Sequence, residues 1–157
     1  MKAVVLHVAE GPRGLRYEEV ETPQPKADEV LIRLRFAALN RRDVLISHGS
    51  YRGMKLPVIL GSDGAGEVAA CGANVRHVHV GDPVIINPGL MWGDSEAHPG
   101  HNFQILGMPT DGTFAQYVAV PAEQVFAKPE HLTWEEAAAL PLAGVTAYRA
   151  RVTRGQL

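Results

Sequence analysis

Six residues near the middle of the chain have the glycine density of a nucleotide-binding loop. The run Gly61-Ser62-Asp63-Gly64-Ala65-Gly66 spaces its glycines as G-x-x-G-x-G. A dinucleotide-binding turn instead has the pattern G-x-G-x-x-G and leads from a strand into a helix. The residues that follow here, EVAAC, favour a strand. The sequence therefore predicts that these glycines serve tight turns and close packing, and that the chain has no phosphate-binding loop of its own.

Seven histidines form the second group that could do chemistry. His77 and His79 are two residues apart, and one long loop carries a mixed group of ligand types. That group consists of Asp94, Glu96, His98 and His101. None of these residues belongs to the paired-cysteine pattern that is typical of a structural zinc site. We therefore expect no metal ion, and the group in the loop remains the alternative.

Cys71 is the only cysteine, which excludes an intrachain disulfide and a zinc site built on several thiolates. It falls in a predicted buried strand, where a thiol is usually inert. The chain also lacks the G-x-S-x-G motif of serine hydrolases. These residues predict no nucleophilic catalysis.

The composition indicates a soluble globular domain. The 157 residues are 46% hydrophobic and 20% charged, and the net charge of −2 gives no reason to expect nucleic acid or an anionic membrane as partner. The N-terminal apolar run is short and contains His7, unlike a signal peptide. No stretch approaches the length of a membrane-spanning helix. We expect a cytoplasmic protein.

The segments that must position the polar residues are mostly strands. From Val30 to Phe36, apolar side chains alternate with Leu31, Arg33 and Arg35, which is the pattern of a half-buried strand. Other strand candidates are bounded by Gly, Asn, Asp and Pro. They span residues 3–8, 67–71, 83–87 and 114–120.

Helix signals are fewer. Asn40 is a candidate N-cap for a short helix, Arg41 to Ser47, with Asp43 in its first turn. Thr133-Trp134-Glu135-Glu136 is a capping box, and Pro141 interrupts the helix that it begins. A second helix is predicted from Gly144 to Arg154, with Gly155 as its end. The region Pro88 to Gly112 has no clear pattern and is predicted to be a long loop.

Short strands followed by late helices predict a mainly β fold with short helices, a partly open β-barrel with a helical exit. A doubly wound parallel sheet is not expected.

The order of the motifs resembles the medium-chain dehydrogenase/reductase superfamily. The motifs are MKAVVL, VLIRLRFAALN, NRRD, PVILGSDGAGEV, VGDPV, DGTFAQYVAVP and WEEAAALPLAGVTAYRA. The resemblance covers nearly the whole chain. It implies a GroES-like substrate or catalytic domain over residues 1–132 and a helical connection over residues 133–157. It further implies that the connection leads toward a Rossmann nucleotide-binding domain that is absent from this chain.

Within that superfamily, the chain is similar to the zinc-free, quinone oxidoreductase-like branch. The resemblance places Asn40, Ser62 and Leu142 where zinc alcohol dehydrogenases carry their metal ligands. The region between Pro88 and Asp111 has none of the four cysteines of their structural-zinc lobe. Asn, Ser and Leu do not make a tight zinc site. The implied activity is hydride transfer from NAD(P)H to a quinone or an α,β-unsaturated carbonyl compound.

The resemblance also implies roles for individual residues. Asn40, Tyr51 and Ser62 are the expected catalytic residues, and Asn40, Arg41 and Thr146 are expected to contact NADP or NAD. The partners expected are a small-molecule substrate and, in the intact enzyme, further copies of the protein. The isolated chain is expected to be inactive, because most of the cofactor would be bound elsewhere.

Two other readings of the sequence stay open. One is a zinc-type alcohol dehydrogenase with atypical ligands, which bound zinc would reveal. The other is a non-catalytic GroES-like binding module.

Overall fold

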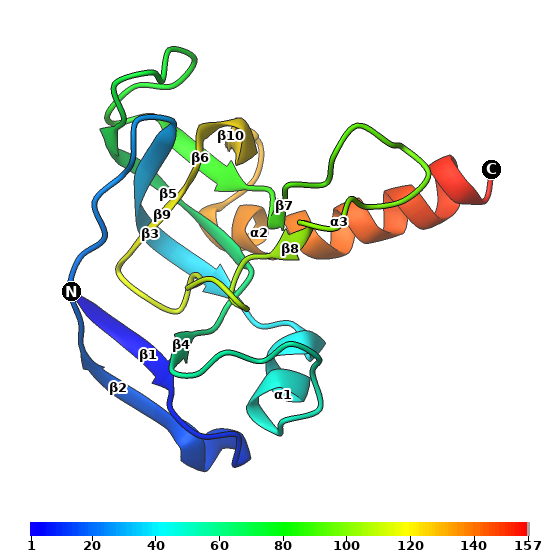
Figure 1. The fold of residues 1–157 in the computed structure, drawn as a ribbon. Helices are drawn as coiled ribbons and strands as arrows, with labels where there is room; N and C mark the ends of the chain where they lie inside the picture. The colour runs from blue at the N-terminus through cyan, green and yellow to red at the C-terminus, as the bar shows by residue number, and fades with distance from the viewer. Residues whose placement is uncertain (157) are drawn as a thin grey trace.

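The computed structural model describes residues 1–156; Leu157, the last residue of the predicted connection 133–157, lies outside them. Its strands form three sheets, all of them antiparallel (Figure 1). The sheets have the orders β2-β1-β4, β10-β6-β5-β3-β9 and β7-β8. The strands are β1 Lys2–Leu6, β2 Leu15–Glu19, β3 Glu29–Ala38, β4 Val58–Ile59, β5 Asp63–Cys71, β6 Pro83–Ile86, β7 Gly89–Leu90, β8 Gln104–Ile105, β9 Tyr117–Pro121 and β10 Val125–Ala127.

The helices are short. They are α1 Arg41–Ser47, α2 Trp134–Ala139 and α3 Pro141–Tyr148, with the 3₁₀ turns η1 Gly11–Gly14 and η2 Ala122–Gln124 and the π-helical segment η3 Arg149–Arg154. None of the helices within residues 1–156 combines the length and apolar character that crossing a membrane requires.

The main core lies inside the five-stranded sheet. Val30 and Ile32 of β3 are fully buried there against Val68, Val84 and Val120 of the neighbouring strands. The alternation predicted for β3 fails at its end, because a bulge between Leu34 and Phe36 shifts the register, and Phe36 is 42% exposed.

The small sheet closes one end of the larger one. The Val4 N–H donates to the carbonyl oxygen of Phe114, and Ala3 forms an isolated bridge with Ala115, just before β9. This curled, wholly antiparallel arrangement confirms the predicted mainly β, partly open barrel.

The long region Pro88 to Gly112 is not structureless. It contains the two-stranded sheet of β7 and β8, which the sequence did not predict. The Trp92 and Phe103 rings pack edge to face, 4.9 Å between centroids.

The C-terminal helices confirm the capping box and the break at Pro141. Thr133 and Glu136 each accept the other's backbone N–H, at 3.3 and 2.9 Å. The second helix begins at Pro141 and not at Gly144, because proline suits the first turn of a helix. At the end of the last helical segment, the left-handed backbone conformation falls on Gln156. Gly155, which was predicted to end the helix, precedes it by one residue.

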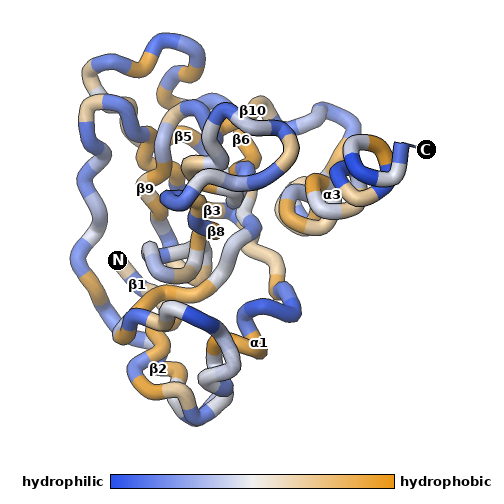
Figure 2. Tube along the Cα trace, turned by 45° about the vertical axis from the view of Figure 1, so that its right-hand side comes forward, coloured by the Kyte–Doolittle hydropathy of each residue, from blue (hydrophilic) through white to orange (hydrophobic). Residues whose placement is uncertain are grey.

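The exit helix, which consists of α3 and η3, projects from the sheets and carries both apolar and polar residues (Figure 2). Its apolar side chains Leu140, Val145, Tyr148 and Val152 are 40–66% exposed. These side chains leave apolar surface uncovered, and we expect the isolated chain to self-associate through it.

Candidate active site

Asn40 and Asp63 connect the start of α1 to the start of α3. The Asn40 side-chain amide donates to Asp63 Oδ2 at 2.9 Å, and the Leu142 backbone N–H donates to Asp63 Oδ1 at 2.8 Å. Leu142 lies in the first turn of α3, where backbone N–H groups have no partner within the helix. Thr113 donates to the Asp63 carbonyl oxygen at 2.7 Å. These bonds bring Asn40, Asp63 and Leu142 together at one point of the fold.

Asp43 holds the same region from the other side. Its carboxylate accepts the Asn40 backbone N–H at 2.8 Å and the Gly61 N–H at 3.3 Å. Asn40 occupies the predicted N-cap position of α1, but its amide nitrogen is directed to Asp63. Two buried carboxylates thus lie on either side of Asn40.

Arg42 is the buried cation of the site, with 8% of its surface exposed. It donates to Ser62 Oγ at 2.6 Å and to the carbonyl oxygen of Leu106 at 2.8 Å. A longer contact of 3.5 Å reaches the Tyr51 hydroxyl, and the guanidinium lies 5.0 Å from the centre of the Tyr51 ring. Arg42 therefore connects α1 to the three segments that carry Ser62, Leu106 and Tyr51.

Burial raises the pKa of both carboxyl groups above the ordinary value of 3.8. For Asp63, the hydrogen bonds from Asn40 and Leu142 oppose this shift, and the charge of Asp43 adds to it. For Asp43, the N–H groups of Asn40 and Gly61 and the charge of Arg42 oppose it. Desolvation of the charged form is the dominant cause in both cases.

Replacing Asp63 with Asn should change how stability depends on pH. A carboxyl whose pKa is raised on folding stabilises the fold fully below the unfolded-state pKa, and this contribution is lost as the pH rises through the folded-state pKa. The free energy of unfolding of the wild type, relative to that of Asp63→Asn, should therefore fall with rising pH. Urea unfolding of both proteins from about pH 4 to pH 8 measures this difference. The exposed Asp94→Asn is the control for loss of a surface charge. A difference that is constant across that range would contradict the assignment.

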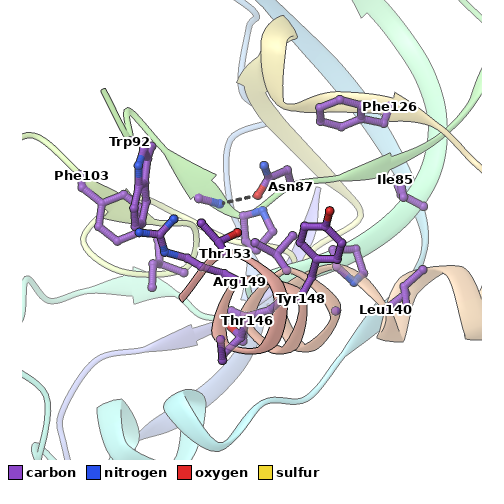
Figure 3. A pocket seen from close by; sticks show the side chains of 18 of the residues that line it. Ile85, Asn87, Trp92, Phe103, Phe126, Leu140, Thr146, Tyr148, Arg149 and Thr153 are labelled. Atoms are coloured by element: carbon purple, nitrogen blue, oxygen red, sulfur yellow. Dashed lines mark hydrogen bonds between the residues drawn. The ribbon is translucent and has the colours of Figure 1, made fainter. Parts of the chain in front are cut away.

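An open groove of about 940 Å³ begins beside this cluster (Figure 3). Leu142 and Thr146 of α3 form one wall, and Asn87 and Pro88, which follow β6, form the opposite wall. The groove continues between η3 and the loop that carries Trp92 and Phe103. Its size and its apolar lining are typical of sites for small molecules.

The structure brings only some of the predicted site residues together. Asn40 meets Asp63, and Arg42 links Ser62 to Tyr51. Ser62 is fully buried, and its hydroxyl also donates to the Leu106 carbonyl oxygen at 2.8 Å. Arg41 is exposed.

Thr146 lines the groove but lies in the middle of α3. The predicted helix start at Gly144 would have left the Thr146 backbone N–H free at the first turn, but this start is wrong, because the helix begins at Pro141. The N–H that this first turn supplies is that of Leu142, and Asp63 accepts it.

Arg42 and Asp63 are residues of this site that were not predicted from the sequence. Ile46 is fully buried, and Arg42 and Asp43 precede it by four and three residues. Residues at these spacings share one face of a helix, so an apolar Ile46 was the available signal that both charged residues point inward.

The part of the chain that the structure describes contains no group of three or more His, Cys, Asp or Glu side chains placed to hold a metal ion. His98 and His101, with Asp94 and Glu96, are spread along an exposed loop. The geometry thus gives no support to the metal-site alternative in that loop.

Comparison with known proteins identifies relatives over most of the chain. The model of the alcohol dehydrogenase GroES-like domain matches residues 26–130. A zinc-type alcohol dehydrogenase-like protein of Schizosaccharomyces pombe is 37% identical over 150 residues, 94% of this chain and 43% of that protein. A crotonyl-CoA carboxylase/reductase of Cereibacter sphaeroides is 38% identical over 152 residues, 89% of this chain and 35% of that protein. The chain spans less than half the length of these relatives.

Solved structures agree. The crystal structure of an NAD-dependent alcohol dehydrogenase superposes with a TM-score of 0.92 at 39% identity and covers 98% of this chain and 47% of that chain. The quinone oxidoreductase from Coxiella burnetii superposes with a TM-score of 0.81 at 29% identity and covers 99% of this chain and 45% of that chain.

Proposed function

The chain belongs to the alcohol dehydrogenase GroES-like domain family, and from this premise we propose that it is the substrate domain of an NAD(P)-dependent oxidoreductase that works without a catalytic zinc. The acceptor is a quinone or an α,β-unsaturated carbonyl compound. The observation that carries the proposal is the chemistry of Asn40, Ser62 and Leu142, of which Asn40 and Leu142 both donate to Asp63 and Ser62 precedes Asp63 in the chain.

These three residues do not suit a zinc ion. Leu142 has no donor atom, and what it contributes is a backbone N–H that Asp63 accepts. Ser62 is buried with its hydroxyl bonded to Arg42 and Leu106, and the cation of Arg42 opposes a second cation beside it. Zinc requires thiolate, imidazole or carboxylate ligands, and the nearby carboxylates are those of Asp63 and Asp43, whose oxygens already accept N–H groups of the protein.

The described residues suit one end of a nicotinamide dinucleotide. The exposed guanidinium of Arg41 has the fork of donors that binds phosphate, and the Thr146 hydroxyl borders the groove. Gly64 and Gly66 do not form a phosphate cradle, because they pack against Leu34 and Arg33 of β3. Most of the cofactor would therefore contact parts of the enzyme outside this chain.

Tyr51 is the donor for the acceptor's carbonyl oxygen. Bound NAD(P)H supplies the hydride, and negative charge develops on that oxygen during the transfer. The Tyr51 hydroxyl accepts from Arg42, which leaves its own hydrogen available to donate. A donor aimed at the developing charge stabilises the transition state. Asn40, held by Asp63, orients the bound reactants.

Removing these polar groups should slow the full-length enzyme. Tyr51→Phe and Asn40→Ala should each lower kcat/KM for an enal or a quinone by about tenfold, the effect of one lost polar contact in the transition state. Steady-state kinetics measure this, with Tyr17→Phe and Asn102→Ala, both exposed, as matched controls. Wild-type rates in both test variants would refute the site assignment.

A zinc-type dehydrogenase with atypical ligands is the second candidate, favoured by the zinc-type relative in Schizosaccharomyces pombe. Tightly bound zinc in the purified full-length enzyme, with loss of activity on chelation, would decide for it. A non-catalytic binding module would show no cofactor-dependent turnover at all.

A further inference from the structure

A loop forms one wall of the outer half of the groove, and side chains of η3 hold this loop in place. The loop runs from β7 to β8 and carries Trp92 and Phe103, which both face the groove (Figure 3). It contains two glycines and one proline, and none of its residues is buried. Such a loop is expected to be mobile unless contacts from elsewhere fix it.

Arg149 supplies those contacts. Its guanidinium lies 4.3 Å from the centre of the Trp92 ring, a cation–π geometry. The same group donates to the carbonyl oxygens of Glu96, at 2.6 Å, and Ala97, at 3.1 Å. Arg154, further along η3, adds a contact of 3.3 Å to the Ala97 carbonyl oxygen.

Trp92 is also fixed on its other sides. Its indole N–H donates to the Ser95 carbonyl oxygen at 2.8 Å, and its ring packs edge to face on Phe103. The indole is thus held between an aromatic edge and a guanidinium, in one orientation relative to the groove.

We propose that Arg149 is a positioning residue, and that Arg149 and Trp92 together determine specificity by fixing the outer wall of the groove around an apolar substituent of the substrate. The inference rests on the proposed function, since it concerns the acceptor reduced there. The reacting end of the acceptor lies near Leu142 and Thr146, and its substituent extends toward Trp92.

The residues that line the groove indicate the chemical class of the substituent that it binds. Ile85, Ile105 and Phe126, with Leu140 and Val145, present aliphatic and aromatic surface, and no carboxylate lines the groove. The side-chain oxygen of Asn87 accepts the Gly89 N–H at 3.0 Å. The groove therefore favours an alkyl or aryl chain over a polar one, and each buried methylene group should favour binding about fourfold.

The test is a comparison of a short and a long 2-alkenal in the full-length enzyme, crotonaldehyde against 2-nonenal. The wild type should prefer the long aldehyde in kcat/KM. Arg149→Ala releases the loop, so the ratio of the two kcat/KM values should fall about tenfold, the equivalent of losing nearly two buried methylene groups. The change should appear in KM for the long aldehyde. Trp92→Leu should lower the ratio as well.

The control is Arg151→Ala, which removes an exposed arginine of the same segment that does not line the groove. It should keep the wild-type ratio. An unchanged ratio in Arg149→Ala and Trp92→Leu overturns the inference, and so does an equal loss for both aldehydes, since that indicates a general structural role. A wild type that reduces neither aldehyde, nor a quinone, overturns the proposed function and this inference with it.

Discussion

Gly66→Ala is expected to unfold the domain. A Cβ atom at this position would lie 2.2 Å from the Arg33 carbonyl oxygen and 2.9 Å from the Leu34 Cα atom. Both are backbone atoms of β3, the strand that pairs with β5 and β9 in the middle of the sheet. No rotamer change relieves such a clash, so the two strands must separate. We expect a loss of about 4 kcal/mol or more, a large share of the roughly 5–15 kcal/mol that stabilises an ordinary domain.

Circular dichroism during thermal and urea unfolding measures this effect, and Gly89→Ala is the matched control. A Cβ atom at Gly89 meets the Asn87 side chain at 3.4 Å, an ordinary contact, so the control should stay within about 1 kcal/mol of the wild type. The comparison also tests the role of the glycine run. If Gly66 served a phosphate-binding loop, its Ala variant would fold normally and lose only cofactor binding.

The parts of the fold that local sequence determines were predictable. The α1 helix begins and ends where its signals place it, from Arg41 to Ser47, because an N-cap position and an acidic first turn act within a few residues. The same holds for α2 and its capping box at Thr133. Strand alternation likewise located β3, except where a bulge turns Phe36 outward.

Elements that depend on distant contacts were not predictable from pattern. β5 begins at Asp63, four residues before the predicted start at Glu67, because Gly64 and Gly66 have low strand propensity. Only their close packing against β3 shows why a strand needs them. The strands β7 and β8 have two residues each, too few for any periodicity.

The residues of the candidate site also divide into those that the sequence could predict and those that it could not. Asn40 could be proposed from its place in a motif, and the structure gives it a partner in Asp63, 23 residues away. The spacing to Ile46 could place Arg42 on the buried face of α1, but neither the partners of Arg42 nor those of Arg149 could be found in this way. Each is defined by contacts with backbone carbonyls more than fifty residues distant, at Leu106 and at Glu96, and sequence patterns report no such pairing.

Purified residues 1–157 alone are expected to transfer no hydride from NAD(P)H to a quinone or an enal. Holding two reactants in near-attack geometry is equivalent to an effective concentration of about 10⁵–10⁸ M, and an enzyme that fixes only one of them loses that advantage. In residues 1–156, the glycines of β5 pack into the sheet, and the candidate contacts to the dinucleotide are confined to Asn40, Arg41 and Thr146. The rate should therefore lie at least about 10⁵-fold below that of the full-length enzyme.

The measurement follows the absorbance of the reduced cofactor with the isolated chain and, as the positive control, with the full-length enzyme. Circular dichroism and cooperative unfolding must first show that the isolated chain is folded, so that inactivity is not a result of misfolding. Leu140 and Val145 are exposed on the isolated chain, and dilution series check that self-association through them does not hide the groove. Turnover by residues 1–157 that needs NAD(P)H and is lost in Tyr51→Phe would place both reactants within this chain. In that case the glycine run, Arg41 and Thr146 would have to bind the dinucleotide without further help, against the packing of β5 on β3.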